Sequence, residues 1–166
     1  MATPPNSPDC FRLVIECWEK AKYDLAAYEL NRMIEANPQI PDNTFTLAIV
    51  YLKLNRQEDA LAVLRQCVDI ESCGDVAPQP VVQIPVGDPD YQFARGFLHL
   101  ETGDLEAAHT ALQASLRARP GDHHTIYQLG RLFIEAGDQA AAREQYLKLS
   151  LLNEPLAKQL YDQIVF

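Results

Sequence analysis

The chain has 166 residues, of which 48% are hydrophobic and 22% are charged, and this composition excludes disorder, collagen and coiled coil for the chain as a whole. Its 14 Lys and Arg residues against 23 Asp and Glu residues give a net charge of −9, which disfavours duplex nucleic acid and anionic membranes as partners. No apolar run approaches the roughly 20 residues of a transmembrane helix, so membrane insertion is not expected.

The first two predicted elements are 34-residue repeats over 7–40 and 41–74, preceded by a disordered N-terminus over 1–6. Both repeats carry a small-then-large pattern, DLAAYEL in the first and EDALAVL in the second, in which Ala26 and Ala60 lie 34 residues apart. Each repeat is predicted to form two helices, and a proline near the end of the first repeat marks the end of its second helix.

A Pro-rich insert over 75–88, DVAPQPVVQIPVGD, interrupts the repeats. Its three prolines forbid a helix and favour extended or polyproline geometry. Its valines and isoleucine are too apolar for a solvated linker, and this suggests that the insert docks on the protein itself. Docked there, the insert would either shield a binding surface or offer a partner a second contact. The alternative is an ordinary loop with a local hydrophobic anchor.

The clearest repetition lies in the next two repeats, 89–122 and 123–156. The sequence TGDLEAA in the first returns 34 residues later as AGDQAAA in the second, and Gly96 and Gly130 keep the same spacing. In the last repeat Gly137 is predicted to end the first helix in a left-handed conformation, and Asp138 after it to cap the second helix; Gly103 and Asp104 hold the same positions in the repeat before it. A single repeat cannot bury its apolar stripe alone, so the repeats are expected to stack.

The C-terminal tail is predicted to form a capping helix over 157–166. Pro155 opens the tail, and proline is favoured at the first position of a helix. The tail carries one apolar stripe, formed by Leu156, Leu160, Tyr161 and Ile164. This stripe is expected to cover the apolar side of the preceding helix, which includes Leu149, Leu151 and Leu152.

These 34-residue helix-turn-helix units resemble the tetratricopeptide repeat. The last unit matches the family's pattern with Ile126, Leu129, Gly130, Phe133, Gly137, Ala142 and Tyr146, and the unit before it with Gly96, Gly103, Ala108, Leu112, Ser115 and Pro120. The earlier units match with Leu47, Ala48, Tyr51, Ala60, Leu64 and Cys67, and with Leu13, Ala26, Leu30 and Pro38. The pattern is broken by Asn55 in place of a glycine, Arg95 in place of leucine, His99 in place of an aromatic residue and Glu154 in place of proline.

The resemblance implies an all-α, right-handed α-solenoid of four tetratricopeptide-like units over 7–156. In that family the first helix of each unit lines a concave groove that holds an extended peptide or a partner's helix. The corresponding residues here, called the groove residues below, are Phe11, Ile15, Trp18, Phe45, Ile49, Leu52, Phe93, Phe97, Leu100, Tyr127 and Arg131. An apolar surface of that size calls for a cover, so a bound partner is expected. Packing of the aromatic residues between units is the alternative.

The family's best-known charged mode of binding, a cationic clamp on a C-terminal carboxylate, has no counterpart here. The clamp positions hold Phe11, Ile15, Thr46, Asp90 and Ala94 in one frame, and the next frame supplies no cationic pocket either. Recognition of the acidic C-terminal tails of chaperones is therefore disfavoured.

Residues with the chemistry of a catalytic or metal site are few, and we expect neither an enzyme nor a metal or other cofactor. His123 and His124 are adjacent and cannot alone build a metal site, and the sequence holds no phosphate-binding glycine loop, serine elbow or HExxH motif. The cysteines form no CxxC pair, and Cys73 near the insert is the most plausible reactive thiol. Reduced thiols and the lack of a secretory signal favour a cytoplasmic protein.

The function predicted by the resemblance is protein binding, as a scaffold, adaptor or chaperone. The expected partner is another protein, which contributes a peptide segment or a helix, and the chain itself is a possible homo-oligomer. One alternative is a cytoplasmic chaperone of a secretion-system substrate, as similar small acidic repeat proteins often are. A second is a self-assembling structural subunit that uses the apolar C-terminus or the groove between copies.

Overall fold

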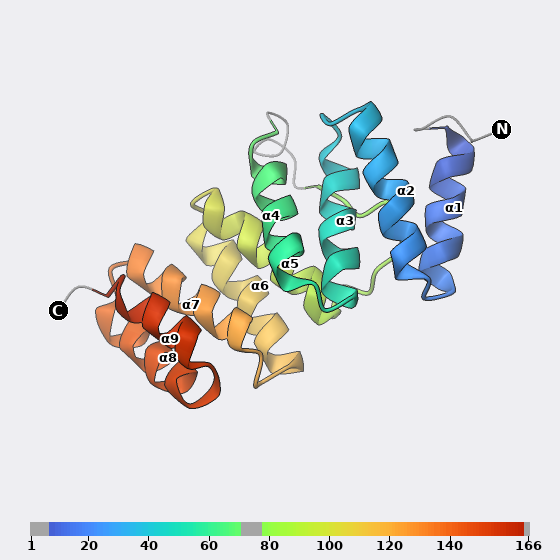
Figure 1. The fold of residues 1–166 in the computed structure, drawn as a ribbon. Coiled ribbons are helices and arrows are strands. Elements are labelled where there is room, and N and C mark those ends of the chain that lie inside the picture. The colour runs from blue at the N-terminus through green and yellow to red at the C-terminus, as the bar shows by residue number, and fades with distance from the viewer. Residues whose placement is uncertain (1–6, 71–77, 165–166) are drawn as a thin grey trace. The chain divides into compact units, whose positions relative to one another are not determined.

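A computed structural model describes residues 7–70 and 78–164, and within these ranges the chain forms nine helices and no strand (Figure 1). Contacts divide the chain into two compact parts, Met1–Pro85 and Val86–Phe166. The all-α, tetratricopeptide-like fold predicted from the sequence is confirmed, because each predicted repeat forms a pair of helices joined by a short turn.

The N-terminal part contains four helices, α1 (Pro8–Glu19), α2 (Tyr23–Ala36), α3 (Pro41–Lys53) and α4 (Gln57–Val68). Each packs against the next along the chain, so that two helical hairpins stack through the contact of α2 with α3. Both first helices begin with a proline in the first turn, where no backbone donor is lost. On α3 every residue from 43 to 52 is buried, which makes this helix the centre of the N-terminal part.

The C-terminal part contains five helices, α5 (Pro89–Glu101), α6 (Leu105–Ala118), α7 (His123–Glu135), α8 (Gln139–Leu152) and α9 (Glu154–Tyr161). The hairpins α5–α6 and α7–α8 pack through α6 and α7, and α9 packs on both α7 and α8. Each of the five helices begins after a side chain that accepts a hydrogen bond from the first turn, namely Asp88, Asp104, Asp122, Asp138 and Asn153.

The same left-handed turn closes the first helix of every repeat. Its residue with positive φ is Ala21 (53°), Asn55 (57°), Gly103 (82°) and Gly137 (78°) in the four repeats. Glycine adopts this conformation without strain and asparagine does so readily, whereas alanine is strained there. Asn55 therefore replaces the expected glycine without changing the turn, and the first repeat keeps the same turn at a cost.

A second contact recurs between the two helices of a repeat. The thiol of Cys67 donates to the carbonyl oxygen of Pro41 at 3.7 Å, and the hydroxyl of Ser115 donates to the carbonyl oxygen of Pro89 at 3.0 Å. Both pairs are 26 residues apart, with a small residue of the second helix beneath the first residue of the first helix. The 34-residue period read from the sequence therefore also holds for this hydrogen bond, which occupies equivalent positions in the second and third repeats.

The capping helix differs in its bounds and in what it covers. It begins at Glu154, before the predicted 157, because the side chain of Asn153 accepts the amide of Leu156 at 3.1 Å and caps it there. It ends at Tyr161, and residues 165–166 lie outside the described residues. The cap buries only one of the three leucines expected beneath it, Leu149; Leu151 and Leu152 are 87% and 52% exposed, because they lie on other sides of α8.

Candidate protein-binding surface

The groove residues of the N-terminal part lie on α1 and α3 and differ in exposure. On α1, Ile15 is 38% exposed, and Phe11 and Trp18 are partly buried. On α3, Phe45 and Ile49 have no exposed surface, and Leu52 is buried as well. The apolar side chains predicted to line the groove in this part are therefore accessible to solvent on α1 and buried on α3.

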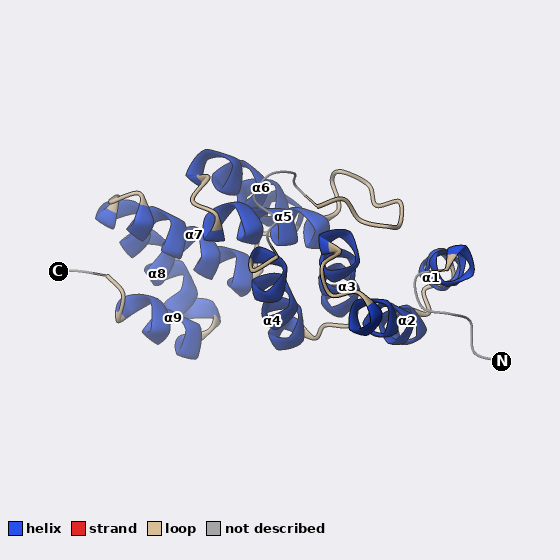
Figure 2. Cartoon of the chain, turned by 90° about the horizontal axis from the view of Figure 1, so that it is seen from above, coloured by secondary structure: helices blue, strands red, loops and turns tan. Residues whose placement is uncertain are grey.

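Part of the insert lies against α3. Figure 2 shows this loop on the side of α3 that is turned away from α2 and α4. The backbone N–H of Gln79 donates to Oδ1 of Asp42 at 2.9 Å, and the backbone N–H of Val81 donates to Oγ1 of Thr46 at 2.9 Å. Within the same segment Pro78 and Val82 are buried. The insert thus docks on the protein itself, as its apolar sequence suggests, while residues 75–77 lie outside the described residues.

Two side-chain oxygens, Oδ1 of Asp42 and Oγ1 of Thr46, form what we call the α3 acceptor site. Asp42 and Thr46 are one helical turn apart and thus share a side of α3. Thr46 is fully buried and donates its own hydroxyl proton to the backbone carbonyl of Asp42 at 2.6 Å. The hydroxyl therefore offers only lone pairs to the insert, and the site as a whole accepts hydrogen bonds.

The α3 acceptor site is absent from the set of groove residues predicted from the sequence. That prediction took the apolar positions of the first helices and tested Thr46 only as part of a clamp for a carboxylate. The available signal was the spacing of Asp42 and Thr46, which puts two acceptors on the same side of a helix that also carries Phe45 and Ile49.

In the C-terminal part, the groove residues of α5 are buried, and those of α7 make polar contacts. Phe93, Phe97 and Leu100 are all buried. On α7, the guanidinium of Arg131 contacts Oε1 of Glu101 at 2.9 Å and Oε1 of Gln128 at 3.0 Å. The hydroxyl of Tyr127 accepts a hydrogen bond from the side-chain amide of Gln163 at 3.0 Å. Here Tyr127 and Arg131 are partly exposed.

Asp90 occupies the same position in its repeat as Asp42 but has a different role. Its carboxylate is buried and accepts two hydrogen bonds from the guanidinium of Arg119, at 2.8 and 2.9 Å. The hydrogen bond to Asp90 is the main cause of a raised pKa of Arg119. This pair ties the end of α6 to the start of α5, so Asp90 serves the fold, whereas Asp42 accepts a bond from the insert.

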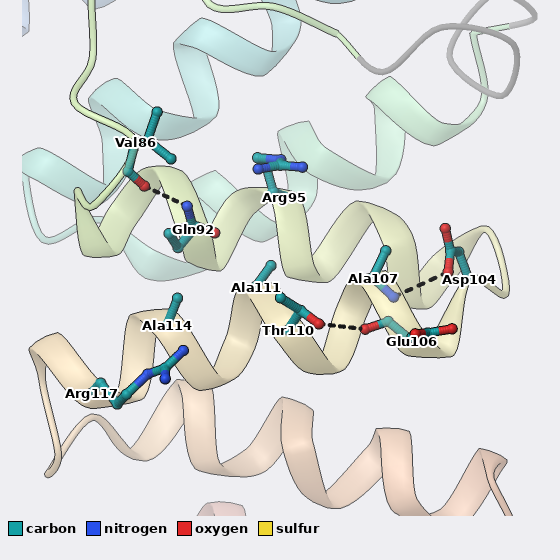
Figure 3. A pocket seen from close by; sticks show the side chains of 10 residues that line it. All are labelled: Val86, Gln92, Arg95, Asp104, Glu106, Ala107, Thr110, Ala111, Ala114 and Arg117. Atoms are coloured by element: carbon teal, nitrogen blue, oxygen red, sulfur yellow. Dashed lines mark hydrogen bonds between the residues drawn. The ribbon is translucent and has the colours of Figure 1, made fainter.

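A cavity of about 580 Å³ lies over α5 and α6 (Figure 3). Gln92 and Arg95 contribute from α5, and α6 contributes a row of small residues, with Arg117 near its end. His99, one turn after Arg95, has its pKa lowered by burial and by the charge of Arg95, although Asp104 opposes the shift. The departures from the family pattern at Arg95 and His99 therefore place polar groups where apolar packing is usual.

No arrangement for metal binding was found among the described residues. No three His, Cys, Asp or Glu side chains gather there in a way that could hold a metal ion. Cys10, Cys17 and Cys67 are buried and form no disulfide with one another. Cys73, singled out as a reactive thiol, lies outside the described residues.

Family models match both parts of the chain. One tetratricopeptide repeat model matches residues 92–159, and a second matches residues 45–72, so that together they cover more than half of the sequence. The chain belongs to the tetratricopeptide repeat family. A search of the curated proteins finds no match. Among the described residues of this tetratricopeptide repeat protein, no helix is long and apolar enough to cross a membrane.

Several solved structures are similar in fold. MamA is 18% identical over 93% of this chain and 76% of its own, with a TM-score of 0.47. A thermophilic tetratricopeptide repeat protein of Thermus thermophilus is 16% identical over 98% of this chain and 84% of its own, with a TM-score of 0.49. PilW, a type IV pilus biogenesis factor, is 18% identical over 93% of this chain and 88% of its own, with a TM-score of 0.38. At such identities and TM-scores, the likeness says nothing about what this chain binds.

Proposed function

We propose that this tetratricopeptide repeat protein is a scaffold, adaptor or chaperone that holds an extended or helical apolar segment of a partner protein on the groove side of its first helices. Repeats of this family are typically non-enzymatic modules of protein interaction, and we propose no catalytic activity. The observation that supports the proposal is the hydrogen bonding of Gln79 and Val81 to the α3 acceptor site. That side of α3 has the chemistry to hold a polypeptide main chain, because it holds one.

On α1 the same side offers apolar contact to a partner. Ile15 is 38% exposed, next to the partly buried Phe11 and Trp18. A segment that lies along this helix would cover the isoleucine, and interface energy concentrates in such apolar anchors. We propose neither nucleic acid nor membrane lipid as a partner, because the net charge of −9 opposes both. The buried cysteines among the described residues form no disulfide, which supports a reducing compartment such as the cytoplasm.

The test begins with a partner captured from an extract of the source cells, identified and purified. Its affinity is then measured for Ile15→Glu and for Leu25→Glu, a matched change at a leucine of α2 that is 53% exposed. We expect Ile15→Glu to weaken binding by about tenfold or more, as for a central anchor, and Leu25→Glu to have little effect. If Leu25→Glu removes binding and Ile15→Glu does not, the partner binds on the side of α2 and the proposal is wrong.

Self-assembly is a second candidate, favoured by leucines on the outside of α8. Leu147 and Leu151 are 61% and 87% exposed and lie one turn apart on the same side of the helix. Light scattering over a range of concentrations tests this candidate. A mass that rises with concentration and returns to the monomer in Leu151→Glu supports self-assembly, whereas a monomer at every concentration excludes it. The secretion-chaperone alternative stays a prediction, with no feature of the described residues that favours it.

A further inference from the structure

We infer that the α3 acceptor site recognises the main chain of an extended Pro-x-Pro-x segment, and that residues 78–82 of the insert occupy it as a competitor within the same chain. The partner of this site is then an uncharged or basic segment of the same pattern, supplied by another protein. The inference rests on the proposed function and names the class of segment that one of its helices binds.

The register of the two hydrogen bonds supports an extended ligand. Asp42 and Thr46 are four residues apart on a helix, a separation of about 6 Å along the axis. Gln79 and Val81 are two residues apart, which spans about 6.6 Å in an extended chain. Because the two distances match, a segment that is extended from residue 78 to the N–H of Val81 presents every second N–H to successive turns of α3, and the chain bends at Val81 and Val82.

The prolines stand at the positions where no N–H is needed. In an extended chain successive N–H groups point to opposite sides, so the amides of Gln79 and Val81 point toward α3 while those of residues 78 and 80 would point away. Both of these residues are proline, which has no N–H to leave unpaired. Proline also limits the freedom of the unbound segment and so lowers the entropy lost on docking. The pattern Pro-x-Pro-x is thus complementary to the α3 acceptor site.

The chemistry of the site restricts its ligand. A carboxylate accepts hydrogen bonds but cannot donate one, and Thr46 has already committed its proton to the backbone. Both groups therefore select N–H donors, and the charge of Asp42 disfavours an acidic segment. The docked sequence agrees, because residues 78–86, PQPVVQIPV, carry no charge at all. After the bonded pair comes the buried Val82, so a small apolar residue at this point completes the pattern.

Since the insert is part of the same chain, it competes at a high effective concentration, which for short tethers is on the order of millimolar. A partner segment binds only in the fraction of molecules in which residues 78–82 have left α3, and its apparent affinity falls in proportion to that fraction. The insert would therefore restrict α3 to segments that bind more tightly than its own sequence or that are brought close by contacts elsewhere, such as those on α1.

The experiment uses a labelled peptide, PQPVVQIP, copied from residues 78–85, and measures its binding by fluorescence anisotropy. The proteins are the full chain and a variant in which 78–85 is replaced by a Gly/Ser linker of equal length, with its helical content checked by circular dichroism. We expect the peptide to bind the linker variant at least about tenfold more tightly than the full chain, the ratio that a largely closed site imposes. Equal binding to both proteins, or no binding to a folded linker variant, would overturn the inference.

Matched variants test the two hydrogen bonds. In the linker variant, Thr46→Val removes the acceptor, and Thr44→Val makes the same change at another buried threonine of α3, whose hydroxyl donates to the carbonyl of Ile40. Only Thr46→Val should lower the affinity for the peptide, by about tenfold, which is the effect of losing one hydrogen bond. In the peptide, N-methylation of Val81 should have a similar effect, whereas N-methylalanine in place of Pro80 should not. Equal losses within either pair would contradict main-chain recognition.

A second protein variant makes the test independent of the linker. Val81→Pro in the full chain removes the donated N–H and leaves the length of the insert unchanged, so it should increase peptide binding; a folded Val81→Pro variant that binds no better than the full chain counts against the inference. The inference and the proposed function fail separately. A partner that needs Ile15 but does not compete with the peptide supports the scaffold and overturns recognition by α3. If the peptide binds as expected but Ile15→Glu does not weaken the partner, recognition by α3 is supported and the scaffold proposal is overturned.

Discussion

Gly130 on α7 lies directly against Leu160 on α9, and a Cβ on the glycine would stand 2.4 Å from Cδ2 of the leucine. The contact fixes the distance between the last repeat and the helix that covers it. Leu160 is fully buried together with Ile126, Ala142 and Leu149, so the capping helix completes the core of the last repeat.

We expect Gly130→Ala to destabilise the protein by about 1–3 kcal/mol, because the added methyl overpacks the contact with Leu160. Gly121→Ala is the matched control, since a Cβ at that exposed position meets nothing within 4 Å. Urea unfolding measures both variants. The double variant Gly130→Ala, Leu160→Ala should lose less than the sum of the two single changes, and strict additivity would show that the two residues do not meet.

Replacement of Ala21 by glycine is expected to stabilise the fold. Its φ of 53° is the left-handed conformation that glycine supplies in the third and fourth repeats. Ala21→Gly should therefore stabilise the chain by about 1 kcal/mol, the cost of holding alanine there. The control is Ala62→Gly, at an exposed site inside α4, where glycine should instead destabilise by about the same amount. A lower melting temperature for Ala21→Gly would show that the turn is not strained.

The fold and its internal period were predictable from the sequence because they depend on local signals. The glycines, the capping aspartates and the small residues of the second helices act within one repeat, and Asn55 was recognisable as a glycine substitute. The start of α9 at Glu154 was missed, although the side chain of Asn153 that caps it is also a local signal. Burial of Phe45 and Ile49 was one of two interpretations that the sequence left open, because the exposure of a side chain depends on tertiary contacts that its own helix does not determine. The pairing of Asp42 and Thr46 with the insert is likewise a tertiary contact between segments 35 to 37 residues apart.

The sequence predicts Phe45 as a groove residue that contacts a partner. Because the structure buries its side chain, we expect Phe45 to stabilise the fold instead. Its side chain is fully buried, so Phe45→Ala should lower the free energy of unfolding by about 3–5 kcal/mol, the usual cost of such a cavity. Ile15→Ala, at a site with 38% exposure, should cost well below that value. Chemical denaturation of the two variants compares them. Similar small losses for both would mean that the ring of Phe45 is accessible in solution.

The stability of the C-terminal part is predicted to fall in mild acid through His99. Burial and the neighbouring charge of Arg95 lower its pKa in the folded state below the ordinary 6.5, against the opposing charge of Asp104. A depressed folded pKa means that the unfolded chain takes up the proton first, so the stabilisation is complete above pH 6.5 and is lost as the pH falls toward the folded pKa.

His99→Gln removes this titration and leaves a polar side chain of similar size. The melting temperature of the variant should therefore fall less than that of the native chain between about pH 7 and pH 5, the range in which histidine titrates. The other histidines contribute equally to both proteins and cancel in the comparison. Parallel curves for the two proteins would show that His99 titrates alike in the folded and unfolded states.

Hydrogen exchange at the backbone amide of Val81 tests most directly whether the groove side of α3 holds a polypeptide main chain. In the full chain this amide should exchange markedly more slowly than in the free peptide PQPVVQIP, because its N–H is donated to Oγ1 of Thr46. Thr46→Val should remove that protection, and Thr44→Val should leave it intact. An amide of Val81 that exchanges in the full chain as fast as in the free peptide would contradict the docking of the insert on α3 and, with it, the binding chemistry assigned to this helix.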